Sequence, residues 1–83
     1  MMNIKEEVRT FLVKMTRQNN LKDDENIFQQ RLVNSLFAMQ LVLFIEKNFH
    51  IHIGQEDMDI ANFQSVNSIV TLIERKIAQG SDI

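Results

Sequence analysis

The sequence predicts an all-α protein, a small four-helix bundle of three long helices and one short helix with a long first loop. The chain contains no proline and only two glycines, so it offers few residues for the tight turns of a β-sheet. Apolar residues recur instead at helical spacing in three separate segments. A chain of 83 residues can bury one small core, so we expect residues 1–83 to form a single domain.

The first helix is predicted over residues 2–17, where Asn3 can act as its N-cap. The following segment, residues 18–31, is polar and contains Asn-Asn and Asp-Asp pairs, which favour a loop. A loop of this length is uncommon inside a compact domain and is usually functional. We expect Ile27 and Phe28 to anchor it to the core. The apolar face of the first helix consists of Ile4, Val8, Phe11, Leu12 and Met15.

The second half of the chain is expected to contain the other three helices. The second helix is predicted over residues 35–49, and an extended piece after it ends at Gly54. Residues 57–62 can form one or two helical turns. The last helix is predicted to begin after Ser65, which can cap it, and to stop at Gly80. Its predicted inner face consists of Val66, Ile69, Val70, Ile73 and Ile77.

Composition and charge exclude several classes of function. Nine Lys and Arg against eleven Asp and Glu give a net charge of −2 with no basic cluster, so we expect no nucleic-acid partner. The absence of cysteine excludes disulfides and thiolate metal clusters. Charges near the N-terminus interrupt any signal peptide, so we expect a cytoplasmic protein. The longest apolar stretch is far shorter than the ~20 residues that span a bilayer, so we expect no membrane association.

The second helix carries more apolar surface than one packing face requires. At 100° per residue, Leu36, Met39 and Leu43 gather on nearly the opposite side from the core face. A central helix could bury them, or they could be singly exposed residues without a role. A short chain with three long helices cannot cover any one of them on all sides. We therefore favour the interpretation that Leu36, Met39 and Leu43 form an exposed docking stripe. The core face is predicted to comprise Ala38, Leu41, Val42, Ile45 and Phe49, with Phe37 and Phe44 beside it.

Ser35 opens this apolar helix, and two roles suit it. As an N-cap, its hydroxyl would accept a hydrogen bond from a free amide of the first turn. Asn34 can cap equally well, and the Ser35 hydroxyl would then be available for a phosphate ester. A phosphate at this place would lie near free amides and the positive end of the helix dipole.

The order of these features resembles the acyl carrier protein family. A polar residue followed by Ser-Leu opens the second helix, an apolar run ends in Glu-Lys-Asn-Phe, and a short helix precedes a last helix that begins with Ser-Val. Many members have Asp-Ser-Leu where this chain has Asn34-Ser35-Leu36. The resemblance extends from about Val8 to Ile77.

The resemblance implies a carrier rather than an enzyme, with no catalytic residue of its own. Ser35 would hold a 4'-phosphopantetheine arm, whose thiol would bind an acyl group as a thioester. The implied partners are a phosphopantetheinyl transferase and acyl-loading, tailoring and synthase enzymes, and we expect the carrier to be a monomer. The residues expected to dock on partners are Asn34, Leu36, Phe37, Met39, Gln40 and Leu43.

The second helix departs from the common family pattern because it has few acids. Many members have an acid before the serine and several along the helix, whereas this helix has Glu46 offset by Lys47. Charge steering should therefore be weak, and recognition should depend on apolar contact. The stretch LVNSLFAMQLVLFIEKNF most resembles free-standing carriers of polyketide and mixed peptide-polyketide pathways. Some of these carriers hold extender units such as methoxymalonyl, hydroxymalonyl or aminomalonyl.

Other residue patterns favour less specific roles. His50 and His52 alternate and could bind a metal, but no cysteine joins them, so we expect solvent-facing histidines and no metal site. The acidic run of residues 23–25 is expected to be solvated. About 14 helical residues separate Ser35 from His50, roughly 20 Å, which is too far for a hydrolytic pair. The alternative to a carrier is a small helical interaction module without a prosthetic group.

Overall fold

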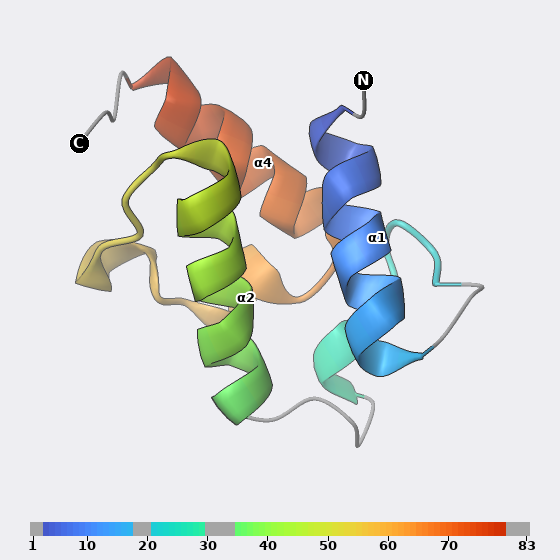
Figure 1. The fold of residues 1–83 in the computed structure, drawn as a ribbon. Coiled ribbons are helices and arrows are strands. Elements are labelled where there is room, and N and C mark those ends of the chain that lie inside the picture. Colours follow the sequence, from blue (N-terminus) through green and yellow to red (C-terminus); the bar gives the residue numbers. More distant parts are fainter. Residues whose placement is uncertain (1–2, 18–20, 30–34, 80–83) are drawn as a thin grey trace.

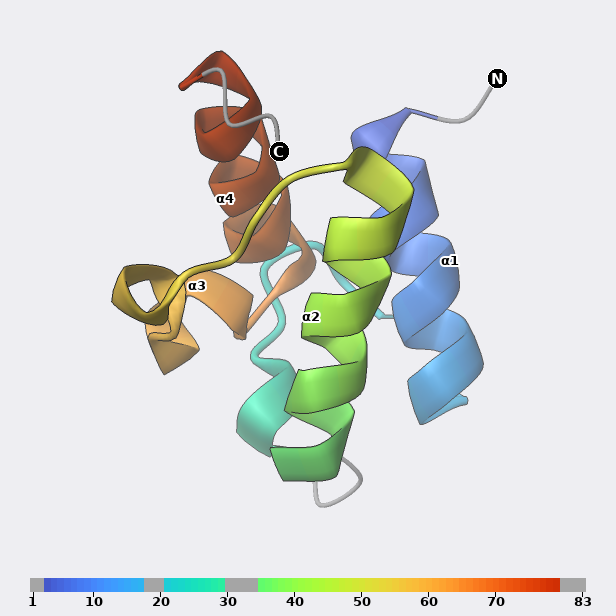
Figure 2. The ribbon, with the colours of Figure 1, turned by 60° about the vertical axis from the view of Figure 1, so that its left-hand side comes forward.

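A computed structural model of the chain describes residues 3–17, 21–29 and 35–79. In these ranges the protein forms four α-helices, three long and one short, and no strand, which confirms the predicted all-α bundle (Figure 1, Figure 2). None of the described helices is long and apolar enough to cross a bilayer. The elements are α1 (Ile4–Thr16), the 3-10 helix η1 (Ile27–Gln29), α2 (Ser35–Phe49), the 3-10 helix η2 (Gln55–Asp57), α3 (Ile60–Phe63) and α4 (Val66–Ala78).

Capping side chains set the starts of α1 and α4. Asn3 accepts a hydrogen bond from the backbone N–H of Glu6 at 2.7 Å, so the predicted cap is confirmed and α1 begins directly after it. Ser65 accepts a hydrogen bond from the backbone N–H of Ser68 at 3.1 Å and caps α4 as predicted. Each cap satisfies a backbone donor that the first turn of a helix cannot pair internally.

The core lies between α1, α2 and α4, and residues of the first loop complete it. Leu21 and Ile27 of that loop are 3% and 0% exposed, and Phe28 packs against the core from its edge. The prediction that Ile27 and Phe28 anchor the loop is therefore confirmed. The fully buried apolar side chains include Val8, Leu12, Ile27, Leu41, Ile45, Val66, Ile69 and Ile73.

The inner face of α4 is rotated from the predicted one. Leu72 and Lys76 are buried, whereas Ile77, predicted to point inward, is 48% exposed. On the Lys76 side of the helix lies Asp57 of η2, which accepts a hydrogen bond from the Lys76 ammonium. Ile77 lies at the end of the bundle where α1 begins and α4 ends.

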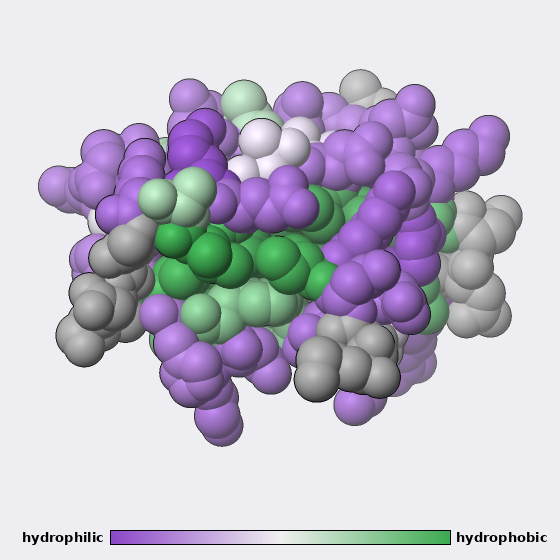
Figure 3. All heavy atoms as spheres, turned by 90° about the horizontal axis from the view of Figure 1, so that it is seen from above, coloured by the Kyte–Doolittle hydropathy of each residue, from purple (hydrophilic) through white to green (hydrophobic). Residues whose placement is uncertain are grey.

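Viewed from this end, the bundle shows apolar side chains in the middle of its surface and hydrophilic side chains around them (Figure 3).

Ion pairs fasten the first loop to α1. The carboxylate of Asp23 lies 2.5 Å from the ammonium of Lys5 and also pairs with the guanidinium of Arg9. Arg9 donates a further hydrogen bond to the carbonyl of Leu21, and the carbonyl of Asp23 accepts the N–H of Asn67 at 2.9 Å. The expectation of a merely solvated acidic run is therefore wrong for Asp23, which joins the loop to both α1 and α4.

A buried ion pair joins η2 to α4. The Lys76 ammonium donates to the Asp57 carboxylate at 2.8 Å, and both side chains are only 9% exposed. The same carboxylate oxygen accepts the backbone N–H of Gly54 at 3.2 Å. The hydrogen bond from Lys76 lowers the pKa of Asp57 below its ordinary value of 3.8, and the Gly54 amide assists, although burial opposes the shift.

The lowered pKa of Asp57 predicts a loss of stability in acid. Because the folded carboxyl has the lower pKa, the unfolded state binds more protons around pH 3.8, and its population rises as the pH falls. The stability advantage of the wild type over Asp57→Asn should therefore be complete at about pH 6. This advantage should decline as the pH falls below about 4 and continues to fall through the lowered pKa of Asp57. Urea unfolding of both proteins at several pH values measures the difference in stability. A difference that stays constant down to about pH 2.5 would contradict the lowered pKa.

Candidate functional site

Ser35 is the first residue of the 15-residue helix α2, as predicted. The first turn of α2 contains no acidic residue, and the amides at a helix N-terminus together with its dipole favour an anion. Asn34, the alternative cap and a predicted docking residue, lies outside the described residues. The serine thus occupies the place in the bundle that a phosphate ester would favour.

An exposed apolar row runs along α2 from the residue after Ser35. Leu36, Met39 and Leu43 are 63%, 61% and 63% exposed, and their spacing of three and four residues places them on one helical face. Gln40, on the same side of the helix, is also exposed. We refer to Leu36, Met39 and Leu43 as the α2 stripe. The predicted separation of this row from the core face is present in the structure.

Phe37 does not belong to this exposed surface. Its side chain is 5% exposed and its ring lies 6.4 Å from that of Phe11 on α1. Phe44, about two turns further along α2, stacks on the same Phe11 ring with centroids 4.2 Å apart. The prediction that Phe37 takes part in docking is therefore wrong. Its ring lies in the seam between α1 and α2, on a different face of α2 from the stripe.

The charges of α2 are few and partly used within the protein. Among its 15 residues only Glu46 and Lys47 are charged, so the helix side chains carry no net charge. The Glu46 carboxylate accepts the backbone N–H of Ile53 at 2.8 Å and lies 3.5 Å from Nδ1 of His52. Glu46 therefore holds the segment after α2, while Lys47 is exposed.

The histidines after α2 do not form a reactive site with Ser35. His50 and His52 are exposed and Ile51 and Ile53 are buried, as the alternation predicts. His50 follows the last residue of α2, at the opposite end of that helix from Ser35. Across the described residues, no three His, Asp or Glu side chains gather where they could hold a metal ion.

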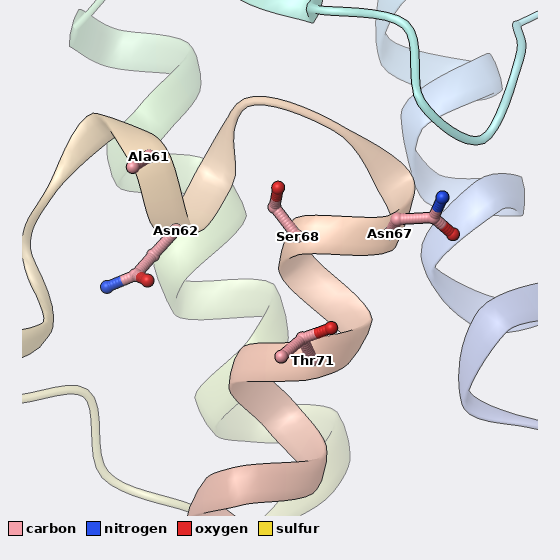
Figure 4. A pocket seen from close by; sticks show the side chains of 5 residues that line it. All are labelled: Ala61, Asn62, Asn67, Ser68 and Thr71. Atoms are coloured by element: carbon pink, nitrogen blue, oxygen red, sulfur yellow. The ribbon is translucent and has the colours of Figure 1, made fainter.

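Two shallow pockets lie away from the start of α2, and sequence patterns did not indicate either. One, of about 310 Å³, follows the seam between α1 and α2. The other, of about 230 Å³, lies between α3 and α4, and its side chains come from both helices (Figure 4). It has no charged side chain, and the Ser68 hydroxyl in it accepts a hydrogen bond from the Ser65 hydroxyl at 3.0 Å. The second pocket is lined by Ala61, Asn62, Asn67, Ser68 and Thr71.

Comparison with known proteins identifies a relative that matches nearly the whole chain. The chain is 36% identical over 75 residues to a protein of Mycoplasmopsis pulmonis (strain UAB CTIP) described as an acyl carrier protein homolog. The match covers 90% of this chain and 97% of that protein. No family model matches the chain.

Proposed function

The chain belongs to the acyl carrier protein family, and from this we propose that it carries an acyl group on a 4'-phosphopantetheine arm attached to Ser35. The observation that carries the proposal is the position of Ser35 as the first residue of α2. The family relationship extends over nine-tenths of the chain, so it rests on most of the bundle and not on one short motif.

The start of α2 fits the phosphodiester of such an arm. Its first turn has no acidic side chain that would repel the phosphate, and the helix N-terminus favours a negative charge. The neighbouring Leu36 is 63% exposed, so a modifying enzyme can contact α2 one residue after the serine. These features support attachment at the start of α2 without any change in the packing of the core.

The chemistry of carriage is divided between the arm and the chain. The arm supplies a thiol, which forms a thioester with the acyl group and which a chain of 83 residues without cysteine lacks. The protein supplies the anchoring oxygen of Ser35 and a rigid helix beside it that partner enzymes contact. It therefore acts as a carrier that is presented to enzymes, with docking through Asn34, Leu36, Met39, Gln40 and Leu43.

The enzymes served by this carrier are proposed from the sequence of α2. A phosphopantetheinyl transferase attaches the arm, and acyl-loading, tailoring and synthase enzymes then use the thioester. The likeness of LVNSLFAMQLVLFIEKNF to free-standing carriers supports a polyketide or mixed peptide-polyketide pathway. Within such a pathway the cargo is an extender unit of the methoxymalonyl type, and the carrier works as a monomer.

Modification at Ser35 can be tested with purified apo-protein, coenzyme A and several broad-specificity phosphopantetheinyl transferases. We expect the intact mass to increase by one phosphopantetheine, and the Ser35→Ala variant to stay unmodified because it lacks the acceptor oxygen. Ser68→Ala is the matched control and should be modified as the wild type is, since Ser68 lies on α4. An unchanged wild-type mass with every transferase would favour the small interaction module and refute the carrier.

A further inference from the structure

The α2 stripe offers a partner apolar contact area with little charge. Its three side chains are 61–63% exposed and follow one another along two turns of the helix. The burial of one such side chain against a partner is worth about tenfold or more in affinity. Apolar contact alone can therefore supply the affinity that a carrier needs for each of its enzymes.

The charges near the stripe do not favour a basic partner. Glu46 is the single acid of α2, and its carboxylate is engaged by the Ile53 amide at 2.8 Å with His52 3.5 Å away. Its side chain is 31% exposed. Lys47, the next residue, is exposed and lies on the same side of the helix as Leu36 and Leu43. A basic patch on a partner that contacts α2 would meet this lysine, and the one acid of the helix is already engaged by the Ile53 amide.

We infer that the α2 stripe docks on partner enzymes through an apolar surface without a basic cluster, with an acidic partner side chain opposite Lys47. The inference rests on the proposed carrier function and concerns the chemistry of the partner's contact face. Like charges brought together across an interface reduce affinity, whereas an acid opposite Lys47 complements it. Charge complementarity therefore selects this class of partner over enzymes whose docking face is a basic patch.

The transfer reaction provides a direct measure of docking. The probe is the phosphopantetheinyl transferase purified from the organism's own cells, and the KM for the apo-carrier is measured at about 0.05 and 0.5 M NaCl. We expect the KM to change less than about twofold with salt, because little charge is screened on docking. Met39→Ser and Leu43→Ser should each raise the KM about tenfold.

Two control variants test whether the effect on the KM is specific to the stripe. One changes an exposed apolar residue elsewhere, and the other changes a charge. Ile77→Ser changes a 48% exposed residue on α4 and should leave the KM within about twofold of the wild type. Lys47→Glu should weaken docking if an acid faces Lys47, and should strengthen it if the partner is basic. Since Met39 and Leu43 are exposed, circular dichroism should show that their serine variants remain folded.

The outcomes distinguish the inference from the proposed function. A KM that falls in Lys47→Glu shows a basic partner and overturns the inference. A KM that rises more than about fivefold with salt also overturns it, because docking then depends mainly on charge and not on the apolar stripe. An unchanged KM in Met39→Ser and Leu43→Ser also overturns the inference. So does a dimer seen in sedimentation that Leu43→Ser dissociates, because a second copy of the chain then covers the stripe. If Ser35 is modified in these experiments, the carrier function stands in each case. Failure of every transferase to modify the wild type refutes the carrier function and the inference together.

Discussion

Replacement of Lys76 by alanine is expected to lower the free energy of unfolding by about 3–5 kcal/mol. The variant would leave the Asp57 carboxylate buried without its ammonium partner, which lies at 2.8 Å in the wild type. A domain of 83 residues has a total stability of about 4–12 kcal/mol, so the loss could unfold a large fraction of the protein. Urea unfolding followed by circular dichroism measures the effect.

The control for this prediction is Lys14→Ala, which removes an exposed lysine from α1 and should change the stability by no more than about 0.5 kcal/mol. The double variant Asp57→Asn, Lys76→Met should recover much of the loss, because it leaves no unpaired buried charge. Equal effects of Lys76→Ala and Lys14→Ala would show that the pair between η2 and α4 contributes nothing to stability.

Truncation of Phe37 to alanine is expected to lower the free energy of unfolding by about 3–5 kcal/mol, the usual cost of removing a buried ring. Phe37 is 5% exposed and contacts Phe11 across the seam between α1 and α2. Leu36→Ala, one position earlier and 63% exposed, should cost no more than about 0.5 kcal/mol. The comparison in urea tests whether the boundary between core and stripe falls between these two residues.

The same two variants, Leu36→Ala and Phe37→Ala, should also differ in a docking experiment, where the exposed residue should have the direct effect. Loss of the exposed Leu36 should weaken transfer of the arm while stability is unchanged, because its side chain belongs to the α2 stripe. Loss of Phe37 should act on folding first. If Leu36→Ala unfolds the protein and Phe37→Ala leaves it stable, the described orientation of α2 is wrong.

Local sequence signals predicted the helices and the outward row of α2. Asn3 and Ser65 cap their helices because their side chains bond to backbone amides three residues ahead, a relation visible in the sequence. The exposure of Leu36, Met39 and Leu43 follows from helical periodicity once one face is assigned to the core. These features depend on neighbours within one or two turns, so sequence alone could indicate them.

Features that join distant segments were not predictable in this way. Lys76 and Asp57 are 19 residues apart, and neither is marked in the sequence as a member of a buried pair. The inward position of Phe37 depends on Phe11 of another helix, and the anchoring of Asp23 depends on Lys5 and Arg9. The two pockets likewise depend on how helices are spaced. Each of these required the tertiary arrangement, which periodicity along one helix does not specify.

The central claim is that Ser35 carries a 4'-phosphopantetheine arm, and mass spectrometry of the protein purified from its own cells tests it most directly. The intact mass should exceed that of the unmodified chain by one phosphopantetheine or its acylated form. Fragmentation should place the added mass on the peptide that contains Ser35. A native protein that has the unmodified mass throughout, or that carries the group on another residue, would contradict the account.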